Sequence, residues 1–335
     1  MSGDEVDIAI PLEVGNWKLE IGSLNGILVI DKPAGITSAG AVAVIKRAFK
    51  ARKVGHAGTL DPFATGVLVC CLNQATRLAL FFLKGEKKYR AEMLLGIETD
   101  TLDATGRVVA ACSDVDFTEE EIQSVFKRFQ GNILQRPPAF SALKHQGVPL
   151  HKLARQGNPV QKPEREIRIS SLEILEIRQP VVRFEVACSG GTYVRSLCAD
   201  IGSALRCGAH LRSLRRIESS GFKESESVPL SDVETLARDG KIVGRIIPMA
   251  DALRRVPPYV ADSDLIEKIQ HGRKLSSKDF FSGPALSPIS SRAVPKSGLI
   301  KIVDPGNNLC AVLDVQQDFD RYEYCCVFHV NRSQT

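Results

Sequence analysis

One short stretch, residues 55–68, limits the possible folds of this chain more than any other. It reads Gly-His-Ala-Gly-Thr-Leu-Asp-Pro-Phe-Ala-Thr-Gly-Val-Leu, and its glycines and proline keep the backbone out of regular helix or strand. An apolar run, Val67 to Leu72, follows directly and predicts a buried strand that anchors the loop. The loop therefore presents one carboxylate, Asp61, on a rigid support, which is a common way to display a reactive group. An ordinary turn explains the same residues, since Asp followed by Pro suits a type I turn.

Length and charge set the next limits. A chain of 335 residues is too long for one average core, so we expect one large domain and a smaller one. No apolar run approaches the ~20 residues that a membrane-spanning helix needs, and we expect no membrane association. Residues 136–216 contain 14 Lys and Arg but only six Asp and Glu. This imbalance indicates either a polyanionic partner or a solvated basic face.

Several classes of function lack their signatures. The nine cysteines form no Cys-x-x-Cys motif, so neither a disulfide framework nor a zinc site is indicated, and we expect a reducing, cytoplasmic environment. The sequence contains no GxxxxGK[ST] loop and no HExxH pair, and its six histidines are scattered. Nucleotide hydrolysis and metal-dependent hydrolysis are therefore disfavoured. We expect no metal and no cofactor.

Hydrophobic periodicity predicts helices and strands in mixed order. Short strands alternate with helices without a βαβ rhythm, which indicates an α+β fold. On the strand that begins near Tyr89, apolar and charged residues alternate, which places Tyr89 on the inner face. The predicted helices run from a Ser38 cap to about Phe49, from the Thr118–Glu121 capping box to about Gln130, and from Tyr193 to about Arg206.

Six further blocks accompany the Asp61 loop. They are GILVIDKP (26–33), KKYRA (87–91), LGIETDTLDA (95–104), PAFSALK (138–144), GGTYVRS (190–196) and GAHLRSLRR (208–216). In this order and spacing, the set resembles the TruB family, the tRNA pseudouridine-55 synthases. The resemblance covers residues 26 to about 250. It implies the pseudouridine synthase fold, in which a mixed, largely antiparallel central sheet is flanked by helices.

The same resemblance implies an activity and three catalytic residues. The activity is the isomerisation of uridine to pseudouridine at position 55, in the T-loop of tRNA, after the base is flipped out of its stack. Asp61 matches the family's nucleophile, Arg195 the arginine that pairs with it, and Tyr89 the aromatic residue that stacks on the base. Read without the resemblance, Arg195 is an exposed helix residue and Tyr89 is ordinary core packing.

Further positions match family residues that bind the substrate. His56 matches the residue that occupies or supports the vacated base stack, although a purely local role in the loop explains it too. Lys32 matches a position near the active site, where a phosphate contact is plausible. Leu214, in the matched block 208–216, is a further residue that we expect to bind the substrate.

The segment 135–163 has five prolines and many basic residues, and it resembles the family's RNA-clasping insertion. We expect a long irregular segment whose Lys144, Lys152 and Arg155 contact tRNA. Guide-RNA-dependent relatives lack this insertion, so its presence favours the stand-alone bacterial type, a monomer that uses no guide RNA. The alternatives are a guide-RNA-dependent relative and a non-catalytic tRNA-binding or folding module.

The remaining chain divides into three parts. Residues 1–24 match none of the blocks, and we expect a flexible extension. Residues 25–255 form the catalytic domain. Residues 256–335 resemble in position the PUA-type RNA-binding domain of many bacterial members, which would contact the acceptor stem of tRNA.

Overall fold

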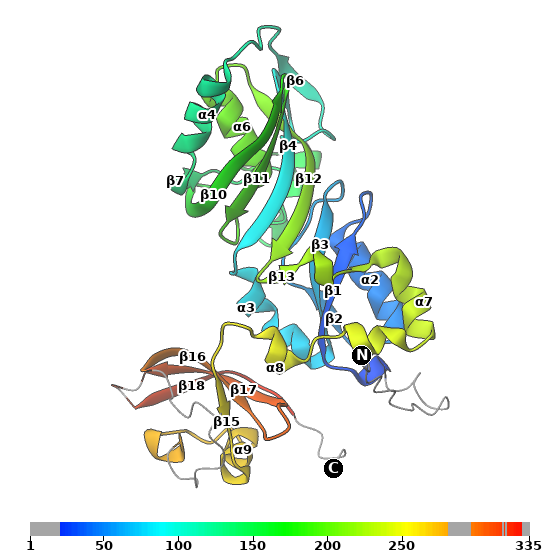
Figure 1. Ribbon diagram of the computed structural model, residues 1–335, viewed down its shortest axis with the longest axis vertical. Helices are drawn as coiled ribbons and strands as arrows, with labels where there is room; N and C mark the ends of the chain where they lie inside the picture. Colours follow the sequence, from blue (N-terminus) through cyan, green and yellow to red (C-terminus); the bar gives the residue numbers. More distant parts are fainter. Residues whose placement is uncertain (1–20, 281–295, 317, 319, 330–335) are drawn as a thin grey trace, which may run out of the picture.

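The structure is a computed structural model that describes residues 21–280, 296–316, 318 and 320–329. A ten-stranded mixed sheet forms the larger part of the molecule, and a four-stranded sheet forms its C-terminal part. Helices lie along the large sheet, and the C-terminal sheet lies beyond its lower end, next to α8 (Figure 1). The predicted α+β class is confirmed.

The large sheet is mixed but mostly antiparallel, as predicted. Only β1 with β14 and β3 with β12 pair in parallel among its described strands. Its order is β14 (Val228–Pro229), β1 (Gly26–Lys32), β3 (Thr65–Leu72), β12 (Ala209–Ser219), β4 (Lys87–Leu95), β11 (Val181–Cys188), β10 (Arg165–Arg178) and β7 (Gly131–Gln135); β2 (Val54–His56) pairs with β3, and β13 (Phe222–Lys223) with β12.

The contact between β3 and β12 is short, although it joins the two halves of this sheet. It consists of two residue pairs, Thr65 with Arg215 and Gly66 with Arg216. On one side lie β1 and β2, and on the other side lie the long antiparallel strands (Figure 1). The loop between β2 and β3 contains Asp61, so this carboxylate is held at the junction between the two halves of the sheet.

Helices cover each half of the sheet where its strands present apolar side chains. Ile45 and Phe49 of α2 pack against Leu28 and Leu68 of β1 and β3. Ile122 and Phe126 of α4 lie in one cluster with α6 and the strands of the other half. The helices are α2 (Ser38–Phe49), α3 (Ala79–Leu83), α4 (Glu119–Arg128), α5 (Leu150–Arg155), α6 (Val194–Ala204), α7 (Val233–Arg238), α8 (Met249–Ala252), α9 (Ser263–Gln270) and the short η1 (Asn73–Leu78), η2 (Glu224–Glu226), η3 (Leu230–Asp232), η4 (Lys241–Arg245) and η5 (Ser277–Phe280).

Two capping predictions have different outcomes. The Thr118–Glu121 capping box of α4 is confirmed, with both reciprocal hydrogen bonds present. The Ser38 cap is wrong, because the side chain of Thr37 accepts the hydrogen bond from the Gly40 amide instead. Ser38 faces inward and is buried, and it bonds the Asp61 loop.

The C-terminal part is a sheet of β15 (Pro258–Val260), β16 (Ser297–Val303), β17 (Leu309–Gln316) and β18 (Arg321–Val327), with α9 packed on β17. Val303, Val312 and Phe328 from this part share one apolar cluster with Val29 and Leu78 from the large sheet and η1. The two parts are therefore joined by buried surface as well as by chain. The remaining strands form two small hairpins, β5 (Ile97–Thr99) with β6 (Val108–Ala111) and β8 (Lys144–His145) with β9 (Val148–Pro149).

The predicted extension, residues 1–24, falls mostly outside the described residues. Of its last four residues, Ile21 is 3% exposed and belongs to the cluster beneath α2. The side-chain amide of Asn73 donates hydrogen bonds to the carbonyl oxygens of Gly22 and Leu24. Residues 21–24 are therefore part of the folded body and not of an extension.

Candidate active site

The loop that carries Asp61 is held by bonds from its own turn and from α2. The amide of Ala64 donates to the carbonyl of Asp61 at 3.1 Å, so Asp61 and Pro62 occupy the first two positions of a β-turn. The carbonyl of Pro62 accepts a bond from the Gly35 amide at 2.8 Å. The Ser38 hydroxyl accepts from the Leu60 amide at 2.8 Å and donates to the Leu60 carbonyl at 3.1 Å. The β-turn that could by itself explain the Asp61-Pro62 pair is therefore present, and it also supports the Asp61 carboxylate.

Asp61 forms an ion pair with Arg195, which lies in the first turn of α6. The Arg195 Nε lies 2.9 Å from Asp61 Oδ2, and Nη2 donates a hydrogen bond to Oδ1 at 3.2 Å. The Nε–H points away from hydrogen-bond geometry, so the first contact is electrostatic. Arg195 is only 4% exposed, whereas the Asp61 side chain is 33% exposed. The arginine is therefore fixed inside the protein and the carboxylate faces outward.

A second carboxylate, Asp103, was missed in the sequence. It is buried, and its Oδ2 lies 3.6 Å from Nη1 of Arg195. Its Oδ1 accepts hydrogen bonds from the hydroxyls of Thr101 and Thr105 at 2.7 and 2.6 Å. The only signal was an acid with a threonine two residues away on either side, Thr101 and Thr105, which gives no indication of contact with Arg195.

Arg195 makes further hydrogen bonds to backbone carbonyls on two different segments. Nη1 donates to Thr101 and Nη2 donates to Phe140, both at 2.9 Å. Burial raises the pKa of Asp61 above its ordinary 3.8, the Arg195 charge opposes that rise, and the Asp103 charge adds to it. The ionised form of Asp61 therefore depends on Arg195.

Tyr89 and Leu214 lie on the neighbouring strands β4 and β12. Both belong to one apolar cluster with Leu60 and Ala64 of the Asp61 loop. Burial raises the pKa of the Tyr89 phenol above 10, although the charge of Arg216 and its hydrogen bond to the phenol oppose that rise. The predicted inward orientation of Tyr89 on β4 is confirmed by its 9% exposure.

Lys32 lies under the loop and has no exposed surface. Its ammonium donates to the carbonyls of Pro33 and Ile36 at 2.8 Å and of Pro62 at 3.3 Å. Burial, followed by the charge of Arg216, lowers the pKa of Lys32 from 10.5 to about 8, although Asp61 opposes this. In this position the lysine supports the Asp61 turn, which argues against the predicted phosphate contact.

His56 ends β2 at the start of the loop and is partly buried. Its Nδ1 is buried without a hydrogen-bond partner among the described residues. Burial and the charge of Arg216 lower the pKa of His56 below 6.5. The imidazole is therefore neutral at pH 7 and keeps one unused polar atom close to the loop.

The basic segment 135–163 is less irregular than predicted, because it contains the β8–β9 hairpin and α5. Leu150 is fully buried, and the His151 amide donates to the Ser141 carbonyl at 3.0 Å, which closes the segment on itself. The N-terminal part of the segment contacts the active site, because the Phe140 carbonyl accepts a hydrogen bond from Arg195. The side chains of Lys144, Lys152 and Arg155 are exposed.

Two general features of the described residues bear on the type of site. They contain no group of three or more His, Cys, Asp or Glu placed to hold a metal ion. No helix among them is long and apolar enough to span a membrane.

Comparison with known proteins gives consistent matches. The N-terminal domain of TruB family pseudouridylate synthases matches residues 46–194, and the C-terminal domain of tRNA pseudouridylate synthase B matches residues 195–256. The tRNA pseudouridine synthase B of Syntrophotalea carbinolica is 45% identical over 74% of this chain and 81% of its own length. That of Dechloromonas aromatica is 39% identical over 87% of this chain and 93% of its own.

A solved structure extends the similarity to three dimensions. It is that of the archaeal box H/ACA sRNP Nop10–Cbf5 complex, and one of its chains is 30% identical to this one. The match has a TM-score of 0.65 and covers 89% of this chain and 81% of the other.

Proposed function

The chain belongs to the TruB family of pseudouridylate synthases, and on that premise we propose that Asp61 carries out its chemistry. Like its curated relatives, it isomerises uridine to pseudouridine in tRNA. We assign the reaction to the uridine at position 55, in the T-loop. The observation that best supports the role of Asp61 is its ion pair with the buried Arg195 at the junction of the two half-sheets.

The reaction explains why a single carboxylate is sufficient. The bond between N1 of uracil and C1′ of ribose breaks, and a bond between C5 and C1′ forms, while a proton leaves C5 and another is gained at N1. No electrons and no groups are added. A carboxylate contributes either as a nucleophile or by stabilising an oxocarbenium-like sugar. Arg195 keeps Asp61 ionised, and Asp103 orients the guanidinium from its other side.

The target base has to leave its stack before Asp61 reaches it, at a cost of a few kcal/mol. Tyr89 and Leu214 offer an aromatic and an aliphatic surface in the apolar cluster that includes Leu60 and Ala64 of the Asp61 loop, and we assign them to the walls of the base pocket. His56 is neutral at pH 7 and has an unused Nδ1, which suits it to hydrogen-bond or stack in the space that the base vacates.

We assign the grip on the T-arm to the clasp, which is the segment 135–163. Lys144 lies on β8 and Lys152 and Arg155 lie on α5, and the three side chains make no hydrogen bond or ion pair within the described part of the chain. Free exposed cations on one folded segment are suited to phosphate oxygens.

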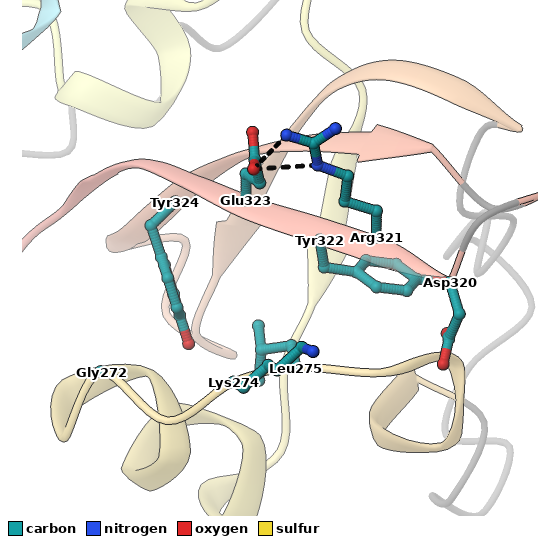
Figure 2. Close-up of a pocket in the computed structure, with 8 residues that line it drawn as sticks. All are labelled: Gly272, Lys274, Leu275, Asp320, Arg321, Tyr322, Glu323 and Tyr324. Atoms are coloured by element: carbon teal, nitrogen blue, oxygen red, sulfur yellow. Dashed lines mark hydrogen bonds and ion pairs between the residues drawn. The ribbon is translucent and has the colours of Figure 1, made fainter.

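The C-terminal part offers a second RNA contact. An open pocket of about 760 Å³ lies between the loop after α9 and the start of β18, and it is lined by Lys274, Tyr322 and Tyr324 among others. Figure 2 shows Tyr324 pointing from β18 toward the 272–275 loop and the ring of Tyr322 extending toward Asp320, with Arg321 and Glu323 on the opposite side of the strand. We propose that residues 256–335 form a PUA-like domain and that this pocket contacts the acceptor stem.

We further propose a stand-alone monomer in the cytoplasm. The relatives named tRNA pseudouridine synthase B are 39% and 45% identical, against 30% for the protein of the H/ACA complex, which supports action without a guide RNA. Six of the nine cysteines are buried, as expected for thiols that pack as small apolar groups in a reducing compartment. A non-catalytic tRNA-binding module is disfavoured, because every reactive position is occupied.

The test of this function is the variant Asp61→Asn, which keeps the shape of the side chain and removes its charge. We expect pseudouridine formation in tRNA to fall by at least ~10³-fold, with the tRNA Kd changed less than about tenfold. Asp116→Asn, at an exposed aspartate outside the site, is the matched control and should keep the parent rate. An Asp61→Asn variant with a tenth of the parent activity would exclude the assignment.

A further inference from the structure

Arg216 is a fully buried arginine that the proposed mechanism does not use. It lies on β12 at the two-pair junction with β3, is 1% exposed, and pairs with Gly66 across that junction. On its other side it pairs with Tyr89 of β4. It therefore occupies the point where the two halves of the sheet and the Asp61 loop meet.

The guanidinium of Arg216 bonds the backbone on both sides of that loop. Its Nε donates to the Val67 carbonyl at 2.7 Å, on β3. Its Nη2 donates to the Gly58 carbonyl at 3.1 Å and its Nη1 approaches the Thr59 carbonyl at 3.4 Å, both in the loop before Asp61. One planar group thus spans the two ends of the loop, which a lysine has too few fixed donors to do.

Glycine permits this close approach. Gly66 has φ +99°, and a Cβ there would lie 2.2 Å from the carbonyl oxygen of Arg216. Gly58 has φ +114°, a conformation that L side chains rarely adopt, and its Cβ position lies 3.5 Å from Nη1. The backbone of the loop is therefore shaped around the arginine.

The charge of Arg216 has no ion-pair partner among the described carboxylates, in contrast to its neighbour Arg215, which pairs with Asp31 and Glu224. Its field lowers the pKa of Lys32, His56 and Lys87, in each case second to burial. A buried, unpaired cation is expensive for stability, and an apolar side chain of similar size would pack the junction at lower cost. The arrangement is one that stability alone does not favour.

We propose that Arg216 is a positioning residue, which sets the place of the Asp61 carboxylate by holding the carbonyls of Gly58 and Thr59 against β3. The inference rests on the proposed role of Asp61. A displacement of the order of 1 Å at a reacting group lowers the rate by about 10²-fold, because catalysis depends on holding the reacting atoms close together and correctly aligned. Arg216 has no contact with substrate in this scheme and acts through the groups that it holds, which are the loop and the phenol of Tyr89.

The test uses the full-length chain and unmodified tRNA, with the single-turnover rate at saturating enzyme and the tRNA Kd measured separately. Three variants are compared: Arg216→Met, Arg216→Lys and, as control, Arg212→Met, which removes an exposed charge from the same strand. Thermal melting of each variant reports whether it folds. Asp61→Asn is measured alongside.

We expect Arg216→Met to lower the rate by about 10²-fold or more and Arg216→Lys by about tenfold, with Kd within threefold of the parent for both. Arg212→Met should keep the rate. If Arg216→Met does not fold, Arg216→Lys decides: a tenfold loss at unchanged Kd supports the proposal, and a parent rate overturns it. A folded Arg216→Met with the parent rate, or with its loss confined to Kd, also overturns it. When the Arg216 proposal is overturned in this way, the Asp61→Asn variant shows which claim is wrong. If Asp61→Asn is also active, the proposed function fails; if Asp61→Asn is inactive, only the role of Arg216 fails.

Discussion

Two carboxylates share one guanidinium at the centre of this site, and only one of them faces outward. Asp103 Oδ1 accepts from two threonine hydroxyls and from the Thr105 amide, whereas the side chain of Asp61 is one third exposed and, among the described residues, hydrogen-bonds Arg195 alone. Burial of Asp61 favours its neutral form, and the arginine restores the ionised form that a nucleophile requires. The roles of the two acids are therefore separated by their surroundings and not by their chemistry.

Removing Arg195 should show how burial and the ion pair oppose each other at Asp61. With Arg195→Met the pKa of Asp61, already raised by burial, loses its main opposing charge and rises further. Less Asp61 is then ionised at a given acidic pH, so the acid limb of the rate profile should move to higher pH. The measurement is the single-turnover rate at saturating tRNA across pH. If Arg195 only contacted phosphate, the loss would instead appear in Kd and in its salt dependence.

At the scale of elements, the side chain of Ser38 ties α2 to the Asp61 loop. Ser38 satisfies both the amide and the carbonyl of Leu60 and is itself 1% exposed. Ser38→Ala should leave two buried backbone groups unpaired and cost about 1–2 kcal/mol in urea unfolding. Because the loop loosens, the reaction rate should fall as well.

Thr37→Ala is the matched control for that variant, since the Thr37 hydroxyl caps the same helix through the Gly40 amide and makes no hydrogen bond to the loop among the described residues. It should cost about 1 kcal/mol of stability and leave the rate unchanged. Equal rates for the two folded variants would show that α2 does not position the loop.

Local patterns predicted these elements better than the contacts between them. The capping box of α4 and the alternation around Tyr89 involve residues a few positions apart, and both predictions are correct. Ser38 and Thr37 are adjacent hydroxyl residues, and only the tertiary fold determines which one caps the helix. The contacts of Arg195 with Asp103 and of Arg216 with Val67 join distant strands, so no local pattern carries them. Even the resemblance that marked both blocks gave no role to Asp103 or Arg216.

The clasp is an element whose predicted role is electrostatic. Changing Lys144, Lys152 and Arg155 to alanine removes three exposed cations, each expected to contribute about 0.7–0.9 to the log–log dependence of affinity on salt. The slope should flatten by roughly two, affinity should fall for all tRNA species alike, and the rate at saturation should stay near the parent value. Alanine at Lys127, Arg128 and Arg178, which are exposed outside the clasp, is the control. An unchanged slope in the clasp variant would reject this assignment.

At the scale of the whole molecule, the two sheets form one body. Lys301 of β16 donates to the carbonyls of Ala250 and Leu253 at 2.7 and 3.1 Å, and Gln74 exchanges two hydrogen bonds with the backbone of His329. Because an apolar cluster also crosses the junction, deleting residues 256–335 would expose part of the core. Point variants on the surface are therefore the sounder way to examine what the C-terminal part binds.

The pocket after α9 should affect long substrates and leave short ones unchanged. The Asp61 loop joins β2 and β3 of the large sheet, whereas Arg273 and Lys274 follow α9 in the C-terminal part. These elements lie in different parts of the molecule, so a tRNA has to extend across it to meet both (Figure 1). Arg273→Ala with Lys274→Ala should lower the salt slope for full-length tRNA by about 1.5 and weaken its binding, since two phosphate contacts are lost. An isolated T-arm stem-loop should bind and react with this variant as with the parent. Arg238→Ala with Lys241→Ala, exposed on the other side of the large sheet, should change neither substrate. If the stem-loop is weakened as much as full-length tRNA, the C-terminal pocket does not contact the acceptor stem.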